Sequence, residues 1–270
     1  MKKILLTIVV ILTATAAFAQ QRRSVEYLTD ENIFYSQNTD AYSLERCVLD
    51  VYYPKGESDC PVIVWFHGGG LVSGNKAIPE QLQNRGYVVI AANYRFMPKA
   101  EVTEIIDDAA AAVAWAFDNA GKYGGDPENI YVSGHSAGGY LTSMIGLDKK
   151  WLAKYGKDAD AIAALVPFSG QVMTHYEYRK RNGGSEYVPT IDDTAPIAHV
   201  RADGPPYIIV SGDRELELYG RYEENAYMWR MMKLIGHEQT FIYELDGYSH
   251  GAMAEPAFYI LRQYVKRKVH

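Results

Sequence analysis

A serine surrounded by small residues gives the clearest indication of chemistry in this sequence. Ser136 is the central residue of G-H-S-A-G (134–138), which directly follows an apolar run ending at Val132. A sharp turn between a strand and a helix would lift the serine hydroxyl into the open, and side chains in place of the glycines would collide with nearby backbone. This pattern is typical of a serine nucleophile. We therefore predict that Ser136 attacks a carbonyl carbon.

A run of glycines upstream could stabilise the negative charge that such an attack creates. The apolar run ending at Phe66 leads into H-G-G-G (67–70). Consecutive glycines allow backbone N–H groups to approach a developing oxyanion closely. The pattern predicts an oxyanion hole formed by the N–H groups of Gly69, Gly70 and Ala137.

A histidine near the end of the sequence is placed to act as the base. His250 lies in G-Y-S-H-G (247–251), after the last strand that the sequence predicts. From this position a general base can reach Ser136 across the edge of the sheet.

The acid that should orient this histidine is less sharply defined. After the strand that ends near Val210, S-G-D-R-E-L-E (211–217) offers three carboxylates. The chain order serine, acid, histidine agrees with this position. A spacing of two residues between the glycine and the acid favours Glu215. Asp213 is the alternative, and Glu217 is a third candidate.

The elements that would position these residues form one α/β domain over residues 20–270, with a mostly parallel, twisted sheet covered by helices on both faces. Predicted strands lie near residues 47–53, 61–66, 87–92, 130–135, 162–168, 207–211 and 239–244. Predicted helices lie near residues 104–120, 137–146, 220–235 and 255–268. Residues 173–203 interrupt this alternation. We interpret them as a lid or pocket wall near the site, and an inert surface excursion is the alternative.

The N-terminus has the composition of an export signal. Lys2 and Lys3 precede the apolar run 4–12, and small residues follow at 17–19. The apolar run is about half of the roughly 20 residues that a membrane span needs. We expect residues 1–19 to be removed, which leaves a periplasmic or secreted protein without stable membrane insertion.

Charge and composition restrict the partners. The formal charge is −6, and removal of two lysines with the signal makes it −8. This acidity argues against nucleic acid or an anionic membrane surface and favours a small, weakly charged substrate. No cluster of histidines and carboxylates has the spacing of metal ligands, and the predicted chemistry requires no metal or cofactor. The oligomeric state is left open.

Two cysteines in an exported chain would ordinarily suggest a disulfide. Cys47 opens a strand that we expect to run antiparallel to its neighbours, whereas Cys60 opens the next strand in the parallel direction. The two would then lie at opposite ends of the sheet, roughly 20 Å apart. A disulfide tolerates less than about 7 Å between Cα atoms. We predict two free thiols.

Five segments together resemble the α/β-hydrolase family. They are H-G-G-G (67–70), N-Y-R (93–95), Y-G-G-D-P (123–127), G-H-S-A-G-G (134–139) and G-Y-S-H-G (247–251). Within this family the chain resembles hormone-sensitive-lipase-like esterases and bacterial feruloyl and acetyl-xylan esterases, over roughly residues 49–264. Two features depart from the pattern. The favoured acid is not the usual Asp, and the short stretch before Cys47 leaves little room for a large N-terminal cap, which favours small substrates over lipids.

The resemblance implies a serine carboxylesterase that acts through an acyl-enzyme on short acyl or hydroxycinnamoyl esters, with carbohydrate as the expected alcohol. An arrangement centred on Glu215 also resembles kynurenine-formamidase-like hydrolases, so an amide hydrolase of this kind is the alternative. A non-catalytic binding protein on a hydrolase scaffold is a more remote one. Within the insertion, Tyr176, Tyr178, Arg179 and Tyr187 could face sugar or aromatic rings, or could pack the insertion onto the core.

Overall fold

One eight-stranded sheet forms the centre of the molecule. The computed structural model describes residues 25–267, so the predicted export signal lies outside the described residues. The strands are β1 (Tyr27–Phe34), β2 (Val48–Pro54), β3 (Cys60–Phe66), β4 (Val88–Ala92), β5 (Gly125–His135), β6 (Ala164–Phe168), β7 (Tyr207–Gly212) and β8 (Thr240–Leu245). Their order in the sheet is β1-β2-β4-β3-β5-β6-β7-β8. β2 pairs antiparallel with both β1 and β4, and all other pairs are parallel.

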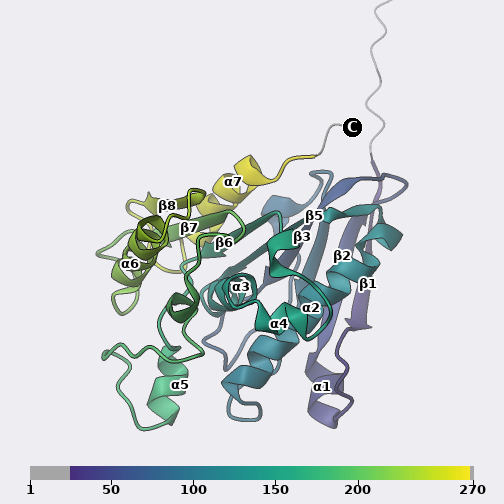
Figure 1. The fold of residues 1–270 in the computed structure, drawn as a ribbon. Coiled ribbons are helices and arrows are strands. Elements are labelled where there is room, and N and C mark those ends of the chain that lie inside the picture. Colours follow the sequence, from purple (N-terminus) through teal and green to yellow (C-terminus); the bar gives the residue numbers. More distant parts are fainter. Residues whose placement is uncertain (1–24, 268–270) are drawn as a thin grey trace, which may run out of the picture.

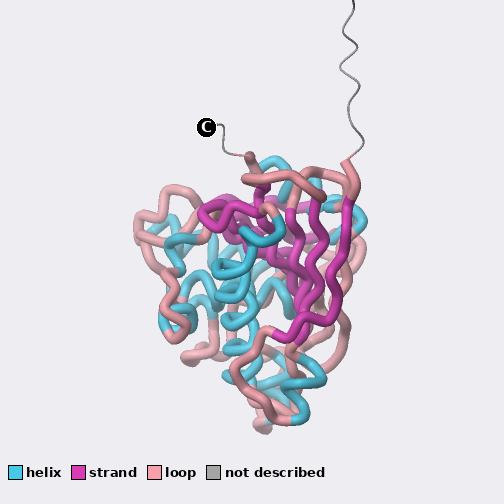
Figure 2. Tube along the Cα trace, turned by 90° about the vertical axis from the view of Figure 1, so that its right-hand side faces the viewer, coloured by secondary structure: helices cyan, strands magenta, loops and turns pink. Residues whose placement is uncertain are grey.

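Helices follow most of the strands (Figure 1). The α-helices are α1 (Ala41–Arg46), α2 (Val102–Asn119), α3 (Ala137–Leu147), α4 (Lys150–Ala153), α5 (Tyr176–Arg181), α6 (Arg221–Leu234) and α7 (Ala254–Tyr264). Short 3₁₀ helices cover Glu80–Leu82, Ala120–Tyr123, Ala159–Ala161 and Pro196–His199. In the view of Figure 2 the strands run side by side, with helices in front of and behind them. This arrangement is the α/β-hydrolase fold that the sequence predicts.

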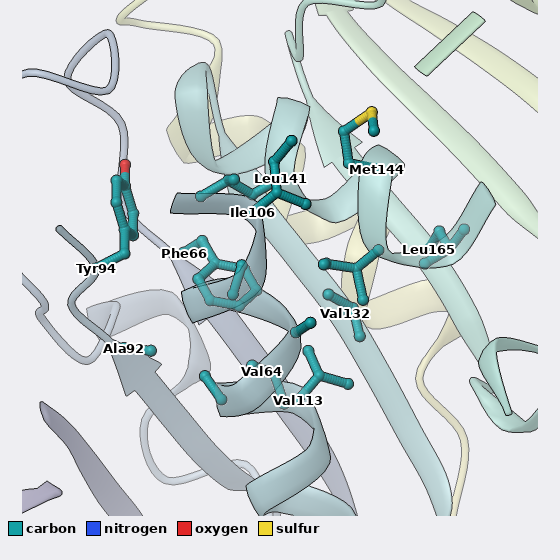
Figure 3. Packing of buried hydrophobic residues seen from close by; sticks show 14 of the residues in the cluster. Val64, Phe66, Ala92, Tyr94, Ile106, Val113, Val132, Leu141, Met144 and Leu165 are labelled. Carbon is teal, nitrogen blue, oxygen red and sulfur yellow. The ribbon is translucent and has the colours of Figure 1, made fainter. Parts of the chain in front are cut away.

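The core has two parts because alternate residues of each strand point to opposite faces of the sheet. Val64 and Phe66 of β3 belong to the larger part, which α2, α3 and α6 cover. Figure 3 shows Val113 of α2 and Leu141 of α3 packed over this face. Trp65 belongs to the smaller part, which α7 covers.

The predicted strands and helices are all present, and one strand was missed. β1 has the sequence Y-L-T-D-E-N-I-F, and its central residues are exposed to solvent. Among the described strands it pairs with β2 alone, at the edge of the sheet. An edge strand of this kind needs no apolar alternation, so the periodicity on which the prediction rested is absent.

The strand directions also settle the positions of the cysteines. Register places Leu49 of β2 beside Ala92, at the end of β4, whereas Cys60 lies beside Gly125 at the start of β5. Cys47 and Cys60 are therefore at opposite ends of the sheet. Both are buried and free, which confirms the prediction.

The carboxyl ends of the parallel strands meet at one edge of the sheet, where ligands of open α/β sheets bind. The loops that follow β3, β5, β6, β7 and β8 all begin there. Among residues 25–267, no helix is both long enough and apolar enough to cross a bilayer.

Candidate active site

Ser136 occupies a strained turn between β5 and α3. Its φ of 56° and ψ of −114° lie in a region that non-glycine residues rarely adopt. A Cβ on Gly138 would lie 2.1 Å from the carbonyl oxygen of Phe66, and one on Gly134 would lie 2.5 Å from the backbone of Gly138. Neither position has room for a side chain. The steric reason for small residues around the serine is thus confirmed.

His250 links this serine to a carboxylate. Its Nε2 atom lies 2.9 Å from Ser136 Oγ, and its Nδ1 atom lies 2.7 Å from Glu217 Oε2. With the proton on Nδ1, the imidazole donates to the carboxylate and its Nε2 accepts from the serine hydroxyl. The structure therefore brings Ser136 and His250 together, as expected.

The predicted acid, Glu215, is wrong, and so is its alternative, Asp213. Glu215 is exposed and makes no contact with His250. Asp213 accepts N–H bonds from Gly247 at 2.7 Å and from Glu215 at 2.8 Å, so its carboxylate ties two loops together. The backbone N–H of Glu217 donates to the carbonyl of Asp213 at 3.0 Å. This helical turn points Glu215 outward and returns Glu217 to the site.

Glu217 is held as a carboxylate in a buried position, with only 1% of its side chain exposed. Burial by itself would raise its pKa, but the hydrogen bond from His250, the hydroxyl of Ser169, the charge of His250 and the N–H of Gly212 lower the pKa to about 2. Its Oε1 atom accepts from Ser169 Oγ at 2.7 Å and from the Gly212 N–H at 2.8 Å. The anion is available to orient and stabilise a protonated imidazole.

Ser169 is a site residue that the sequence analysis missed. It follows β6 and has a φ of 46°. Its Oγ atom lies 2.7 Å from Glu217 and 2.9 Å from His250 Nδ1. Arg221, a completely buried side chain, donates to its backbone carbonyl. A serine before a glycine at the carboxyl end of a buried strand was the available signal.

His135 holds the loop that carries the catalytic histidine candidate. Its Nε2 atom lies 2.7 Å from the backbone oxygen of His250, and the two rings lie 4.8 Å apart. Burial, aided by the charge of His250, lowers the pKa of His135 to about 4. A neutral imidazole with its proton on Nε2 donates to that oxygen and fixes the base loop over the serine.

The glycine loop after β3 lies beside the serine. Gly69 has a φ of 120° and Gly70 a φ of 64°, which side chains rarely adopt. A Cβ on Gly68 would lie 3.3 Å from Ser136 Cβ. Among the hydrogen bonds of the described residues, none has the N–H of Gly69, Gly70 or Ala137 as donor. Their role as the oxyanion hole stays a prediction.

His67 supports this loop from behind. Its Nδ1 atom lies 2.6 Å from the carbonyl oxygen of Gly68, and its ring stacks on Tyr94 at 4.4 Å. Burial lowers the pKa of His67 to about 4, so the ring is neutral near pH 7. Within the described part of the chain, no group of three or more histidine, cysteine, aspartate or glutamate side chains is placed to hold a metal ion.

The family model named BD-FAE matches residues 49–217, more than half of the chain. The chain belongs to the BD-FAE family. Esterases related to hormone-sensitive lipase make up this family. The match covers the glycine loop, Ser136 and the acid loop through Glu217.

Curated relatives of this BD-FAE chain carry esterase names. Esterase LipC of Mycobacterium tuberculosis is 29% identical over 76% of this chain and 56% of its own length. The probable isoprenylcysteine alpha-carbonyl methylesterase ICME of rice (Oryza sativa subsp. japonica) is 31% identical over 37% of this chain and 26% of its own. The chain thus spans about half or less of the length of the curated relatives it matches.

Solved structures with this fold include esterases of similar size. Esterase 2 of Thermogutta terrifontis, phosphoramylated by tabun, has a TM-score of 0.69 and 23% identity, and covers 87% of this chain and 93% of its own. A truncated carbohydrate esterase from gut microbiota has a TM-score of 0.69 and 19% identity, over 91% of this chain and 99% of its own. At these identities the likeness shows the fold that this BD-FAE member shares with them.

Proposed function

We propose that the chain is a serine carboxylesterase that hydrolyses short acyl or hydroxycinnamoyl esters of carbohydrates. The observation that carries the proposal is the unbroken hydrogen-bonded series Glu217–His250–Ser136 at the carboxyl edge of the sheet. A serine activated by an oriented imidazole performs acyl transfer. Membership of an esterase family and the esterase names of the relatives support the same reaction.

The reaction proceeds in two steps. His250 Nε2 takes the proton of Ser136 as Oγ attacks the ester carbonyl, and Glu217 stabilises the imidazolium that forms. The N–H groups of Gly69, Gly70 and Ala137 hold the negative oxygen of the tetrahedral intermediate. His250 then gives its proton to the leaving alcohol, which departs as the acyl-enzyme forms. Water, activated by the same histidine, releases the acid.

The choice of a carbohydrate ester rests on three supports. One solved structure with this fold is titled a carbohydrate esterase, the sequence predicts export, and the chain has a negative net charge. We propose that the mature protein acts outside the cytoplasm. The formamidase-like alternative rested on an acid at Glu215 and loses that basis with Glu217 in its place. The non-catalytic alternative requires a damaged nucleophile or base, and Ser136 and His250 are both present and in contact.

A hydrolysis panel tests the proposal. The chain from Gln20 onward is assayed on aryl acetate, butyrate and octanoate, methyl ferulate, acetylated xylan and N-formylkynurenine, with Ser136→Ala as the matched control. Hydrolysis of the esters by the wild type but not by Ser136→Ala supports an esterase. Release of acetate from acetylated xylan or of ferulate from methyl ferulate supports the substrate class. Turnover of N-formylkynurenine alone would overturn the proposal in favour of the amide hydrolase. Inactivity on all six would overturn the enzyme assignment. Fractionation of expressing cells tests the location, and retention of the full-length chain in the cytoplasm would contradict export.

A further inference from the structure

The cluster of tyrosines and one arginine in the insertion has members of two kinds: some hold the insertion in shape, and others are exposed to solvent. Arg179 is buried, and its guanidinium donates to the backbone oxygens of Thr174, Ser185 and Glu186. It therefore holds the two ends of the 174–186 segment together. Tyr178 is partly buried against the main core. These two residues give the insertion a fixed shape, and other tyrosines of the region remain open to solvent.

Between the insertion and the start of α6 lies a cavity of about 340 Å³. Its wall includes three exposed tyrosines, a proline and three glutamates: Tyr187, Tyr219, Tyr227, Pro189, Glu186, Glu223 and Glu224. All three tyrosines are exposed, and Tyr187 is the most exposed large hydrophobic side chain of the described residues. Contact between large aromatic rings and water is unfavourable in free energy. A concave wall that exposes several such rings is therefore typical of a ligand site.

A row of rings connects this cavity to the catalytic edge. The ring centres of Tyr187 and Tyr219 are 5.4 Å apart, and those of Tyr219 and Tyr176 are 5.6 Å apart. A Cβ on Gly70 would lie 2.7 Å from the hydroxyl of Tyr176. Tyr219 of the cavity wall is thus one ring contact away from Tyr176, whose hydroxyl lies beside the glycine loop. We assign the cavity to the alcohol portion of the ester, because an acetyl group on Ser136 adds only two carbon atoms; occupation by a hydroxycinnamoyl group is the contrary outcome that methyl ferulate tests below.

The charges of the wall select a neutral ligand. Arg179, the cation among the described lining residues, already donates to three carbonyls. Glu224 accepts from the side chain of Gln171 and from two backbone N–H groups, so it is structural. Glu186 lies 3.4 Å from the ammonium group of Lys180, and Glu223 lies 2.6 Å from the guanidinium of Arg214, so each of these carboxylates is paired with a cation. A wall whose charges are already paired offers no free cation to a carboxylate ligand, and it suits a neutral ligand whose hydroxyls donate to the second oxygen atoms of Glu186 and Glu223.

Resting on the proposed esterase function, we infer that this cavity binds a sugar unit of a neutral oligosaccharide, beyond the unit that carries the ester. The apolar C–H face of a sugar ring packs on Tyr187 and Tyr219, and its hydroxyls donate to Glu186 and Glu223. The enzyme is then selective for esters on oligosaccharides over esters on single sugars.

The first test measures binding without turnover. Xylotriose and cellotriose, both neutral, and trigalacturonate, an anion of similar size, are titrated into Ser136→Ala by calorimetry. We expect one of the neutral trisaccharides to bind and trigalacturonate not to bind. Tyr187→Ala in that background should weaken binding about tenfold, whereas Tyr187→Phe, which keeps the ring, should stay within about twofold. Tyr259→Ala on α7 is the matched control, since Tyr259 is similarly exposed and lies outside this cavity.

The second test measures selectivity. The ratio of kcat/KM for a singly acetylated trisaccharide to that for an acetylated methyl glycoside should exceed one and should fall about tenfold in Tyr187→Ala through KM. No binding by either neutral trisaccharide, equal losses in Tyr187→Ala and Tyr259→Ala, or a loss confined to methyl ferulate would overturn the inference. The outcome is separable from that of the proposed function, because failure to hydrolyse any ester overturns the esterase whereas trisaccharide binding to Ser136→Ala still decides the cavity.

Discussion

The position of the acid makes a sharp prediction: Glu217→Gln should cripple turnover, and Glu215→Gln should not. Glutamine keeps the shape of the buried side chain but removes its charge. Its amide also presents N–H groups toward His250 Nδ1 or turns them toward Ser169 and Gly212, which already donate to Glu217. Either orientation leaves a donor facing a donor or the imidazole in the wrong tautomer.

The expected loss in kcat can be worked out from the lowered pKa of the Glu217 carboxyl group. The pKa of Glu217 is lowered from its ordinary value of 4.5 to about 2, and each unit corresponds to about 1.4 kcal/mol. The surroundings therefore favour the anion by about 3 kcal/mol, which corresponds to roughly a hundredfold in rate if it is lost in the transition state. The wrong tautomer adds to this, and the equivalent change in a serine protease costs about 10⁴ in kcat. We expect a fall in kcat between about a hundredfold and ten-thousandfold.

Single-turnover and steady-state assays on an aryl acetate measure this prediction. Glu215→Gln should stay within about twofold, because Glu215 is exposed and does not contact His250. Asp213→Asn should fall between the two, because the carboxylate of Asp213 holds Gly247 in the loop that carries His250. If Glu217→Gln kept more than a tenth of the wild-type kcat, or if Glu215→Gln lost as much, the acid would not be Glu217.

The same shift predicts how stability depends on pH. Because the pKa of Glu217 is lower in the folded state, the folded chain binds its proton less readily than the unfolded chain. The stabilisation is fully present above pH 4.5 and is lost as the pH falls toward about 2. The free energy of unfolding of Glu217→Gln should therefore fall less steeply over this window than that of the wild type, which urea denaturation at each pH would measure. Parallel curves would contradict the shift.

Three further outcomes are expected. Ser136→Ala should lose several orders of magnitude in kcat with an unchanged circular dichroism spectrum, and a residual rate above a tenth of wild type would exclude Ser136 as the nucleophile. Acetate and butyrate esters should be better substrates than octanoate, because the Tyr176 hydroxyl narrows the space beside Gly70; a preference for octanoate in the panel would contradict this. Cys47 and Cys60 should resist labelling in the folded protein, since burial raises the pKa of both thiols, and should give two labels per chain after unfolding without reductant, whereas none would indicate a disulfide.

The parts of the site that the sequence predicts are those with a local cause. The turn around Ser136 requires small residues because side chains at Gly134 and Gly138 would collide with the backbone of the turn and of Phe66 on the neighbouring strand. Any serine in such a turn meets the same backbone, so the requirement is visible in five consecutive letters. His250 follows the last strand, so its loop begins at the carboxyl edge of the sheet, where Ser136 also lies. The fold is predictable for a similar reason, since buried strands are short apolar runs.

The acid could not be predicted because its position depends on a contact between distant segments. The carboxylate of Asp213 binds the N–H of Gly247, which lies 34 positions further along the chain. That bond shapes the turn that places Glu217, rather than Glu215, against His250. The spacing between glycine and acid carries no information about it. Ser169 was missed for a related reason, because it touches the site only after β6 has taken its place between β5 and β7.

Ser169 gives a final prediction that separates its hydroxyl from its backbone. Ser169→Ala and Ser169→Gly both remove the hydrogen bond to Glu217. A hydrogen bond to a charged group contributes about 1.5–3 kcal/mol. Glu217 keeps three other donors, namely His250 and the N–H groups of Gly212 and Leu218, so kcat should fall about tenfold in both variants. Residue 169 has a φ of 46°, which strains a non-glycine backbone by about 1–3 kcal/mol. Only Ser169→Gly relieves this strain, and the larger backbone entropy that glycine loses on folding partly offsets the gain. Ser169→Gly should therefore be more stable than Ser169→Ala by about 1 kcal/mol in urea denaturation. Full activity in both variants would mean that the hydroxyl does not position the acid, and equal stability would mean that the turn after β6 is unstrained.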